Sequence, residues 1–241
     1  MNIFVDDGGV MSDPRDRPAQ WQALVSEFFS ARLGGEAAAW AEANRLEIQG
    51  LFARFPAVMG RPTEDDWQTQ WQAYQVDWVR LMARRAGIAV SDSDAACLAL
   101  ADEASIYITR RVRVAYPGAA DALRSLHATG HRLFTASGTV SYSLDGTLRG
   151  MGVRHLFQRI YGPDLINVGK GHSRFYEAVF AHAGVDPTSA AVVDDSSLHL
   201  LRAAALGAKT VLVSKDKTPV DGIDLVISSL GELPQVVQKL R

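Results

Sequence analysis

The second half of the chain alternates short apolar runs with stretches of helical periodicity. After the tripeptide YPG at residues 116–118, apolar runs of strand length are separated by helical sequence. These runs are HRLFTAS at 131–137, RIYG at 159–162, AAVVDD at 190–195, KTVLVS at 209–214 and DLVIS at 224–228. Strands that alternate with helices form a parallel sheet covered on both faces, and such sheets bind ligands at the carboxyl ends of their strands.

The first half of the chain has a different pattern. Residues 2–6, NIFVD, predict one buried strand, and little strand signal follows between residues 18 and 112. Helix boundaries in that region are indicated by glycines and by capping-box-like starts, at Gly34, Gly35 and Gly87 and at Thr63–Asp66 and Ser91–Asp94. We therefore predict a Rossmann-like α/β core domain of residues 1–13 and 114–241, interrupted by a helical domain of residues 14–113.

The composition agrees with one sizeable core and one insertion. With 241 residues, 47% of them hydrophobic, the chain exceeds one average domain but is short for two. A net charge of −2 gives no excess of positive charge for binding nucleic acid or an anionic membrane surface. The single Cys97 excludes an internal disulfide, and the sequence shows neither a leader peptide nor a membrane-spanning apolar run. We expect a cytoplasmic protein with a small-molecule substrate, and the oligomeric state is left open.

Polar residues lie at the ends of predicted strands or just beyond them. They are Asp6 with Asp7, Thr135, Lys170, and Asp194 with Asp195. The carboxyl ends of parallel strands share one edge of a sheet, so these residues can converge on one ligand. Two groups of carboxylates would bind a hard divalent cation such as Mg²⁺, and a lysine and a hydroxyl would contact a phosphoryl group.

In its order along the chain, this set resembles the motifs of the haloacid dehalogenase-like hydrolase superfamily, and the resemblance covers almost the whole chain. The matching stretches are DDGGVM at 6–11, LFTAS at 133–137, VGKGHSRFYEAVF at 168–180 and VVDDSSLHLLRAAALG at 192–207. The helical region occupies the place of the cap domain that such hydrolases carry between their first and second motifs. The resemblance implies a hydrolase that uses Mg²⁺ and forms an aspartyl-phosphate intermediate.

The first motif can be aligned with the family pattern D-x-D-G in two registers. If the tripeptide GVM at 9–11 follows the second aspartate position, Asp6 is the nucleophile and Gly8 replaces the second aspartate. A shift by one residue makes Asp7 the second aspartate but leaves the inert Val5 as the nucleophile. We favour Asp6, because this register keeps the glycine and the apolar pair in phase and leaves NIFV as an uninterrupted strand.

The resemblance assigns a role to each motif. Asp6 would attack phosphorus, and Lys170 would offset negative charge on Asp6 and on the substrate. The expected metal ligands are Asp6, the Gly8 carbonyl, Asp194 and Asp195. The expected contacts of the phosphoryl group are Thr135, Ala136 and Lys170.

Gly8 is the main departure from the family pattern, because the second aspartate normally protonates the leaving group and then activates water. The acidic pair at 194 and 195 favours a metal, so we expect a Mg²⁺-dependent hydrolase of a small phosphorylated metabolite. One alternative is a haloacid dehalogenase-type hydrolase of carbon–halogen bonds, in which Asp6 attacks carbon. The other is a non-catalytic binding protein with the same fold.

Other side chains could contribute to the active site, but for each of them surface exposure or packing is the simpler explanation. His199 falls where many relatives carry another acid, yet a lone helical histidine is more often a surface residue. Arginines that could reach a substrate anion, but are expected to be solvated charges, are Arg15, Arg17, Arg54 and Arg61. Trp67, Trp71 and Trp78 share one helical face, and we expect them to pack within the helical domain.

Overall fold

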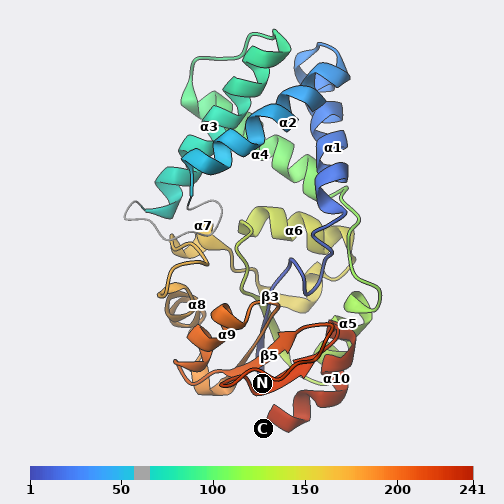
Figure 1. Ribbon diagram of the computed structural model, residues 1–241, viewed down its shortest axis with the longest axis vertical. Coiled ribbons are helices and arrows are strands. Elements are labelled where there is room, and N and C mark those ends of the chain that lie inside the picture. The colour runs from blue at the N-terminus through green and yellow to red at the C-terminus, as the bar shows by residue number, and fades with distance from the viewer. Residues whose placement is uncertain (57–65, 241) are drawn as a thin grey trace.

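The computed structural model describes residues 1–56 and 66–240 and contains a six-stranded sheet in which every pairing is parallel. The strands are β1 Asn2–Val5, β2 Arg132–Thr135, β3 Phe157–Arg159, β4 Ala190–Asp194, β5 Lys209–Val213 and β6 Leu225–Ile227. Their order in the sheet is β3-β2-β1-β4-β5-β6, so the N-terminal strand lies between strands from far along the chain (Figure 1). The predicted α/β fold with a parallel sheet is confirmed.

Helices cover both faces of the sheet. They are α5 Ala119–Ala128, α6 Ser141–Gly150, α7 Pro163–Ile166, α8 Phe175–Ala183, α9 Ser197–Ala204 and α10 Leu233–Val236, with short 3₁₀ turns at η1 Arg154–Leu156, η2 Pro187–Ser189, η3 Leu230–Glu232 and η4 Val237–Leu240. Side chains alternate along a strand. Ile3 and Val5 therefore pack with α5, α6 and α10, whereas Phe4 packs with α8 and α9 on the other face.

Strand β3 lies earlier in the chain than its apolar pattern predicts. We expected it at residues 159–162, but pairing with β2 ends at Arg159, after a register shift beside Leu133 and Phe134. Beyond that point the Tyr161 carbonyl accepts hydrogen bonds from the Thr135 hydroxyl and the Ser137 amide. The apolar residues Ile160 and Tyr161 are buried in the apolar clusters on the two faces of the sheet, but they lie outside the strand ladder.

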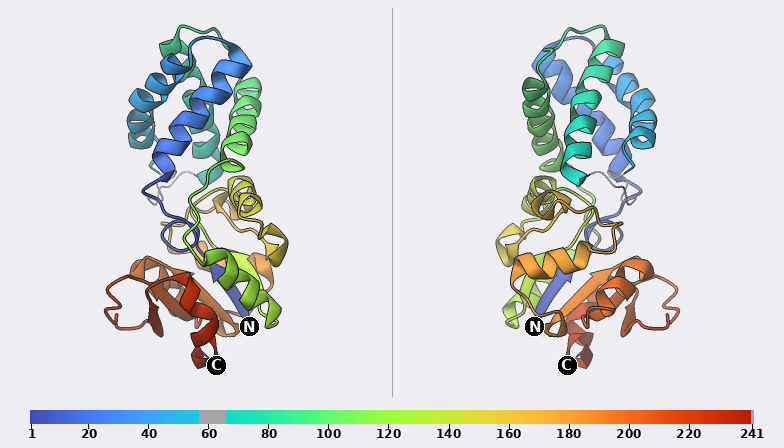
Figure 2. Two further views of the ribbon diagram at one scale, coloured as in Figure 1. Left: turned by 90° about the vertical axis from the view of Figure 1, so that its right-hand side faces the viewer. Right: turned by 90° about the vertical axis from the view of Figure 1, so that its left-hand side faces the viewer.

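The region between β1 and α5 forms a bundle of helices, α1 Arg17–Leu33, α2 Ala37–Arg54, α3 Trp67–Ala86 and α4 Asp94–Thr109. The bundle has its own apolar cluster, in which Phe29 stacks on Trp40 with ring centroids 5.0 Å apart. Two chain segments connect it to the sheet (Figure 2). They pair through a Ser12–Ala115 bridge. The domain boundaries at residues 13/14 and 113/114 stay a prediction.

The caps of two helices differ from the expected positions. Asp66 caps α3 by accepting a hydrogen bond from the Thr69 amide, and the predicted partner Thr63 lies outside the described residues, as does Arg61. Ser93, rather than Ser91, caps α4. No helix in the described part of the chain is both long and apolar enough to cross a bilayer.

The Phe4 side chain offers a test of the sheet core. Its ring stacks on Phe134 at 4.7 Å and meets the Phe180 ring edge-on at 5.1 Å. We expect Phe4→Ala to lower the free energy of unfolding by about 3–5 kcal/mol, because it leaves a cavity in a packed core. Urea denaturation followed by circular dichroism measures this loss.

The matched control is Leu198→Ala, which removes a side chain of α9 that is 58% exposed. We expect a change within about 0.5 kcal/mol for this variant. Similar losses in both variants would contradict the packing described for Phe4.

Candidate active site

Three carboxylates meet at the carboxyl ends of the central strands. Val5 of β1 pairs with Val193 of β4, so Asp6 and Asp194 emerge side by side at one edge of the sheet. Asp195 follows directly, and oxygens of Asp6, Asp194 and Asp195 lie within 4.8 Å of one another. The structure thus brings together carboxylates that are nearly two hundred positions apart, as the strand pattern predicts.

Lys170 lies between two of these carboxylates. It comes from the loop between α7 and α8 and is only 5% exposed. Its Nζ is 2.9 Å from Asp6 Oδ2 and 2.7 Å from Asp194 Oδ2. The Arg202 guanidinium of α9 fixes this loop by donating a hydrogen bond of 2.8 Å to the Gly171 carbonyl.

Burial and charge act differently on the two carboxyl groups that Lys170 contacts. Burial raises the pKa of Asp6 to about 6, with the nearby Asp194 charge adding to the effect and Lys170 opposing it. Burial also acts to raise the pKa of Asp194, but the Lys170 charge and hydrogen bonds outweigh it and hold that pKa below its usual value. Burial raises the pKa of Asp195 as well. Three carboxylates therefore face one ammonium group, which favours a bound cation.

The two glycines of the first motif differ in the space around them. Gly9 has φ +79°, and a Cβ there would lie 2.0 Å from Asp195 Oδ2, so a side chain at this position would displace Asp195. A Cβ at Gly8 would meet no described atom within 4 Å. The side-chain position at residue 8, where the favoured register expects the second aspartate, is therefore open space among the described residues.

Asp7 is turned toward the helical bundle. It is fully buried, and its Oδ2 is 2.7 Å from Nη2 of Arg17, the first residue of α1. Its Oδ1 accepts a hydrogen bond of 2.6 Å from Ser12 Oγ. The alternative register would need Asp7 at the catalytic position, but these partners engage both of its oxygens.

Thr135 does not join the acidic group. It pairs with Val5, one residue before Asp6, and its buried hydroxyl donates a hydrogen bond of 3.0 Å to the Tyr161 carbonyl. Ala136 lies beside Asp6, and its amide donates to the Val5 carbonyl. The predicted contact between the Thr135 hydroxyl and a phosphoryl group is not supported by this geometry, because alternation along β2 places Thr135 on the face of Val5.

Tyr176 and His199 both face Asp194. Tyr176 of α8 is fully buried and donates a hydrogen bond of 3.0 Å to Asp194 Oδ2. Sequence analysis missed it, because its place in an apolar helical pattern is typical of a core residue. His199 Nδ1 lies 3.6 Å from Asp194 Oδ1, which is too far for a strong hydrogen bond.

A cavity of about 600 Å³ lies between the helical bundle and the loop after β2. Trp67, Trp71 and Tyr74 of α3 form one side of it, and Gly138 and Thr139 belong to the other. Gly138 also lies against the site, since a Cβ there would be 3.7 Å from Lys170 Cβ. Two of the three tryptophans of α3 therefore line a cavity, whereas Trp78 packs in the bundle and donates to Asn44 Oδ1.

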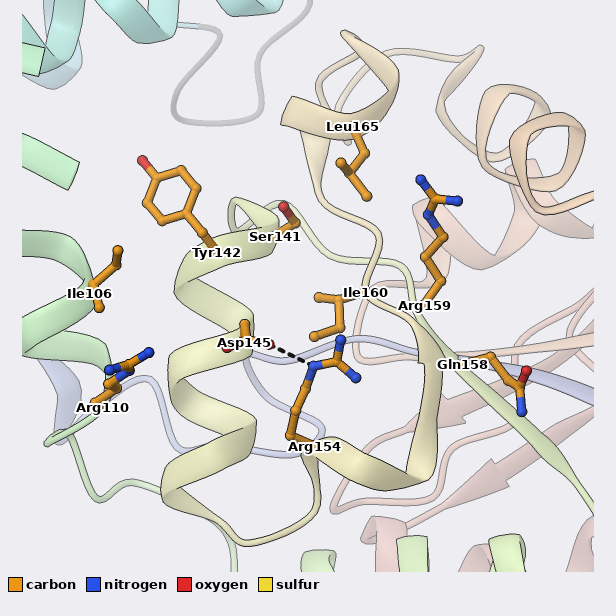
Figure 3. Close-up of a pocket in the computed structure, with 10 residues that line it drawn as sticks. All are labelled: Ile106, Arg110, Ser141, Tyr142, Asp145, Arg154, Gln158, Arg159, Ile160 and Leu165. Atoms are coloured by element: carbon orange, nitrogen blue, oxygen red, sulfur yellow. Dashed lines mark hydrogen bonds and ion pairs between the residues drawn. The ribbon is translucent and has the colours of Figure 1, made fainter. Parts of the chain in front are cut away.

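A second cavity of about 530 Å³ is lined by residues of α4, α6, β3 and α7 (Figure 3). Arg110, Arg154 and Arg159 contribute to it, and Arg154 is paired with Asp145 at 2.6 Å. The arginine side chains point in different directions rather than toward one centre (Figure 3). None of the carboxylates of the acidic group lines this cavity.

A family model of haloacid dehalogenase-like hydrolases matches residues 19–219. The chain belongs to this family. The matched range begins after Asp6, so the first motif rests on the sequence and the geometry above. The hydrolase class and the fold inferred from the motifs are confirmed.

Both phosphatases and dehalogenases are among the known proteins that resemble this chain. A phosphoglycolate phosphatase from Caulobacter vibrioides is 30% identical over 124 residues, which are 50% of this chain and 52% of that protein. The chain thus aligns with about half the length of this curated relative.

Among solved structures, the 2-haloacid dehalogenase from Pseudomonas syringae has a TM-score of 0.67 at 16% identity, with both chains covered completely. A HAD phosphatase from Thermococcus onnurineus has a TM-score of 0.59 at 18% identity, covering 98% of this chain and 97% of the other. At these identities the likeness shows the fold alone.

The Asp7–Arg17 pair predicts different effects for two nearby arginines. Arg17→Met leaves the buried Asp7 carboxylate without its charged partner. We expect a loss of about 3 kcal/mol in the free energy of unfolding, which is at the low end of the range for removing one partner of a buried ion pair. The guanidinium is 24% exposed, which moderates the effect.

Arg15→Met is the matched control, because Arg15 is 72% exposed and pairs with Asp13 at the surface. We expect its urea midpoint to stay close to that of the unmodified protein. Equal shifts of the midpoint in the two variants would show that the Asp7–Arg17 pair does not stabilise the fold.

Proposed function

We propose that this protein is a Mg²⁺-dependent hydrolase of a small phosphate monoester, with Asp6 as the nucleophile. The observation that carries the proposal is the group of Asp6, Asp194 and Asp195 oxygens within 4.8 Å, next to the ammonium of Lys170. Attack of Asp6 on carbon with release of halide needs no cation, so a group of three carboxylates favours the metal-dependent reaction. The partial match to a phosphoglycolate phosphatase supports the same choice.

The residues present fit Mg²⁺. This ion takes oxygen ligands, and the group offers carboxylate oxygens with more negative charge than Lys170 compensates. The backbone hydrogen bonds of the first-motif loop are accepted by the carbonyls of Asp7 and Ser12, so they do not engage the Gly8 carbonyl. Asp6, Gly8, Asp194 and Asp195 would hold the ion, which when bound supplies positive charge to the phosphoryl oxygens.

The chain's own residues would carry out the reaction in two steps. A carboxylate oxygen of Asp6 attacks phosphorus, and the bond to the leaving oxygen breaks with its electron pair. Water then hydrolyses the aspartyl-phosphate and frees Asp6 and inorganic phosphate. Lys170 stays protonated, since its carboxylate neighbours raise its pKa more than burial lowers it, and it offsets the charge of Asp6.

Metal removal separates this proposal from its rival. We expect chelation to abolish phosphate release from a panel of phosphate monoesters, and added Mg²⁺ to restore it. Asp195→Asn should raise the Mg²⁺ concentration for half-maximal rate by at least about 10-fold. Asp216→Asn, in an exposed loop, is the control and should leave that concentration unchanged. Halide release from a 2-haloacid in the presence of chelator would instead establish the carbon–halogen hydrolase.

Paired substitutions test the assignment of the nucleophile. Asp6→Asn removes the attacking carboxylate, and we expect turnover to fall by at least about 10³-fold. Asp7→Asn keeps one oxygen that can accept from Ser12 or Arg17 and leaves the Asp6 carboxylate in place, so its turnover should stay within roughly 10-fold. Phosphate release under saturating Mg²⁺ measures both. A larger loss in Asp7→Asn than in Asp6→Asn would contradict the assignment.

A further inference from the structure

The open space at Gly8 restricts the leaving groups that the site can expel. General acid catalysis contributes about 10²–10⁴-fold when a leaving oxygen must take a proton. A Cβ at Gly8 would meet no described atom within 4 Å, so no described side chain fills this place. Without that acid, rapid cleavage requires an oxygen that leaves as a stable anion. Phenol-type oxygens satisfy this requirement, whereas alkyl alcohols do not.

The cavity beside the site is suited to an aromatic ring. Trp67, Trp71 and Tyr74 stack in series along α3, with successive ring centroids 5.3 Å apart. Phe52 of α2 stacks on Tyr74 at 6.1 Å and also lines the cavity. A volume of about 600 Å³ lies in the range of small-molecule sites. Aromatic walls of this kind bind flat apolar ligands through offset or edge-to-face contacts.

The cavity also lies next to the reacting group, although Asp6, Lys170, Asp194 and Asp195 do not line it. Gly138 lines it and lies against the Lys170 side chain, and Arg17 lines it while pairing with Asp7 beside the nucleophile. A molecule with phosphate at Asp6 could therefore extend its body into the cavity.

From these two observations we propose that the substrate is an aryl phosphate monoester, with its ring in the cavity along α3. This inference rests on the phosphatase function proposed above and specifies its substrate class. The Asp6–phosphorus bond forms as the bond from phosphorus to the aryl oxygen breaks. The electron pair leaves on that oxygen as a phenolate, which takes its proton from solvent afterwards. Water then adds to the aspartyl-phosphate, and inorganic phosphate leaves.

The first experiment varies the leaving group. Phenyl phosphates with progressively less acidic phenols, together with ethyl phosphate, are compared in the presence of Mg²⁺. We expect kcat/KM to fall steadily as the pKa of the leaving group rises. Gly8→Asp should raise kcat/KM for ethyl phosphate by about 10²-fold or more. Gly8→Ala adds a side chain without a carboxyl group and should give no such gain for ethyl phosphate.

The second experiment tests the cavity. Phenyl phosphate is compared with acetyl phosphate, which also has a good leaving group but carries no ring. Trp71→Leu should raise KM for phenyl phosphate by roughly 10-fold and leave acetyl phosphate unchanged. Tyr107→Leu removes an aromatic side chain of α4 that does not line the cavity and should change neither value. Circular dichroism confirms that each variant is folded.

The outcomes separate the two proposals. If ethyl phosphate is cleaved as fast as phenyl phosphate, or Trp71→Leu affects phenyl phosphate and acetyl phosphate equally, the aryl substrate is excluded while the phosphatase stands. If the unmodified protein releases phosphate from none of these compounds, the phosphatase proposal itself fails, and the aryl substrate with it.

Discussion

One buried ammonium group makes the candidate site possible. The parallel pairing of β1 with β4 brings Asp6 and Asp194 to the same edge of the sheet, where burial disfavours two neighbouring carboxylates. Lys170 lies within 2.9 Å of both and compensates part of their charge. Tyr176 and Arg202 support this arrangement, one through Asp194 and the other through the loop that carries the lysine. The charge that remains, with Asp195 added, is what suits the site to a divalent cation.

The architecture could be predicted because it depends on patterns that repeat along the chain. Alternating strands and helices imply a parallel sheet, and a parallel sheet gathers strand ends at one edge. The meeting of Asp6 with Asp194 and Asp195 follows from that rule without any distance information. Lys170 lies outside the strands, and its charge-offsetting contact with Asp6 was expected only from the resemblance to a known family.

Features that depend on exact register or on the approach of separate elements could not be predicted. Thr135 ends a strand as expected, but its pairing with Val5 rather than Asp6 directs its hydroxyl to the Tyr161 carbonyl. Arg15 and Arg17 look alike in sequence, yet one pairs at the surface and the other with a buried carboxylate. Helical periodicity places Trp71 and Trp78 on one face, but it does not show that only the first reaches beyond the bundle.

The linkage between Asp7 and Arg17 has a mechanical consequence. Arg17 begins the first helix of the bundle, and Asp7 follows directly on Asp6, the proposed nucleophile. Any swing of the bundle away from the sheet must therefore break this ion pair or drag the adjoining peptide with it. While the ion pair is intact, the position of the bundle and the position of Asp6 are coupled through the peptide bond that joins Asp6 to Asp7.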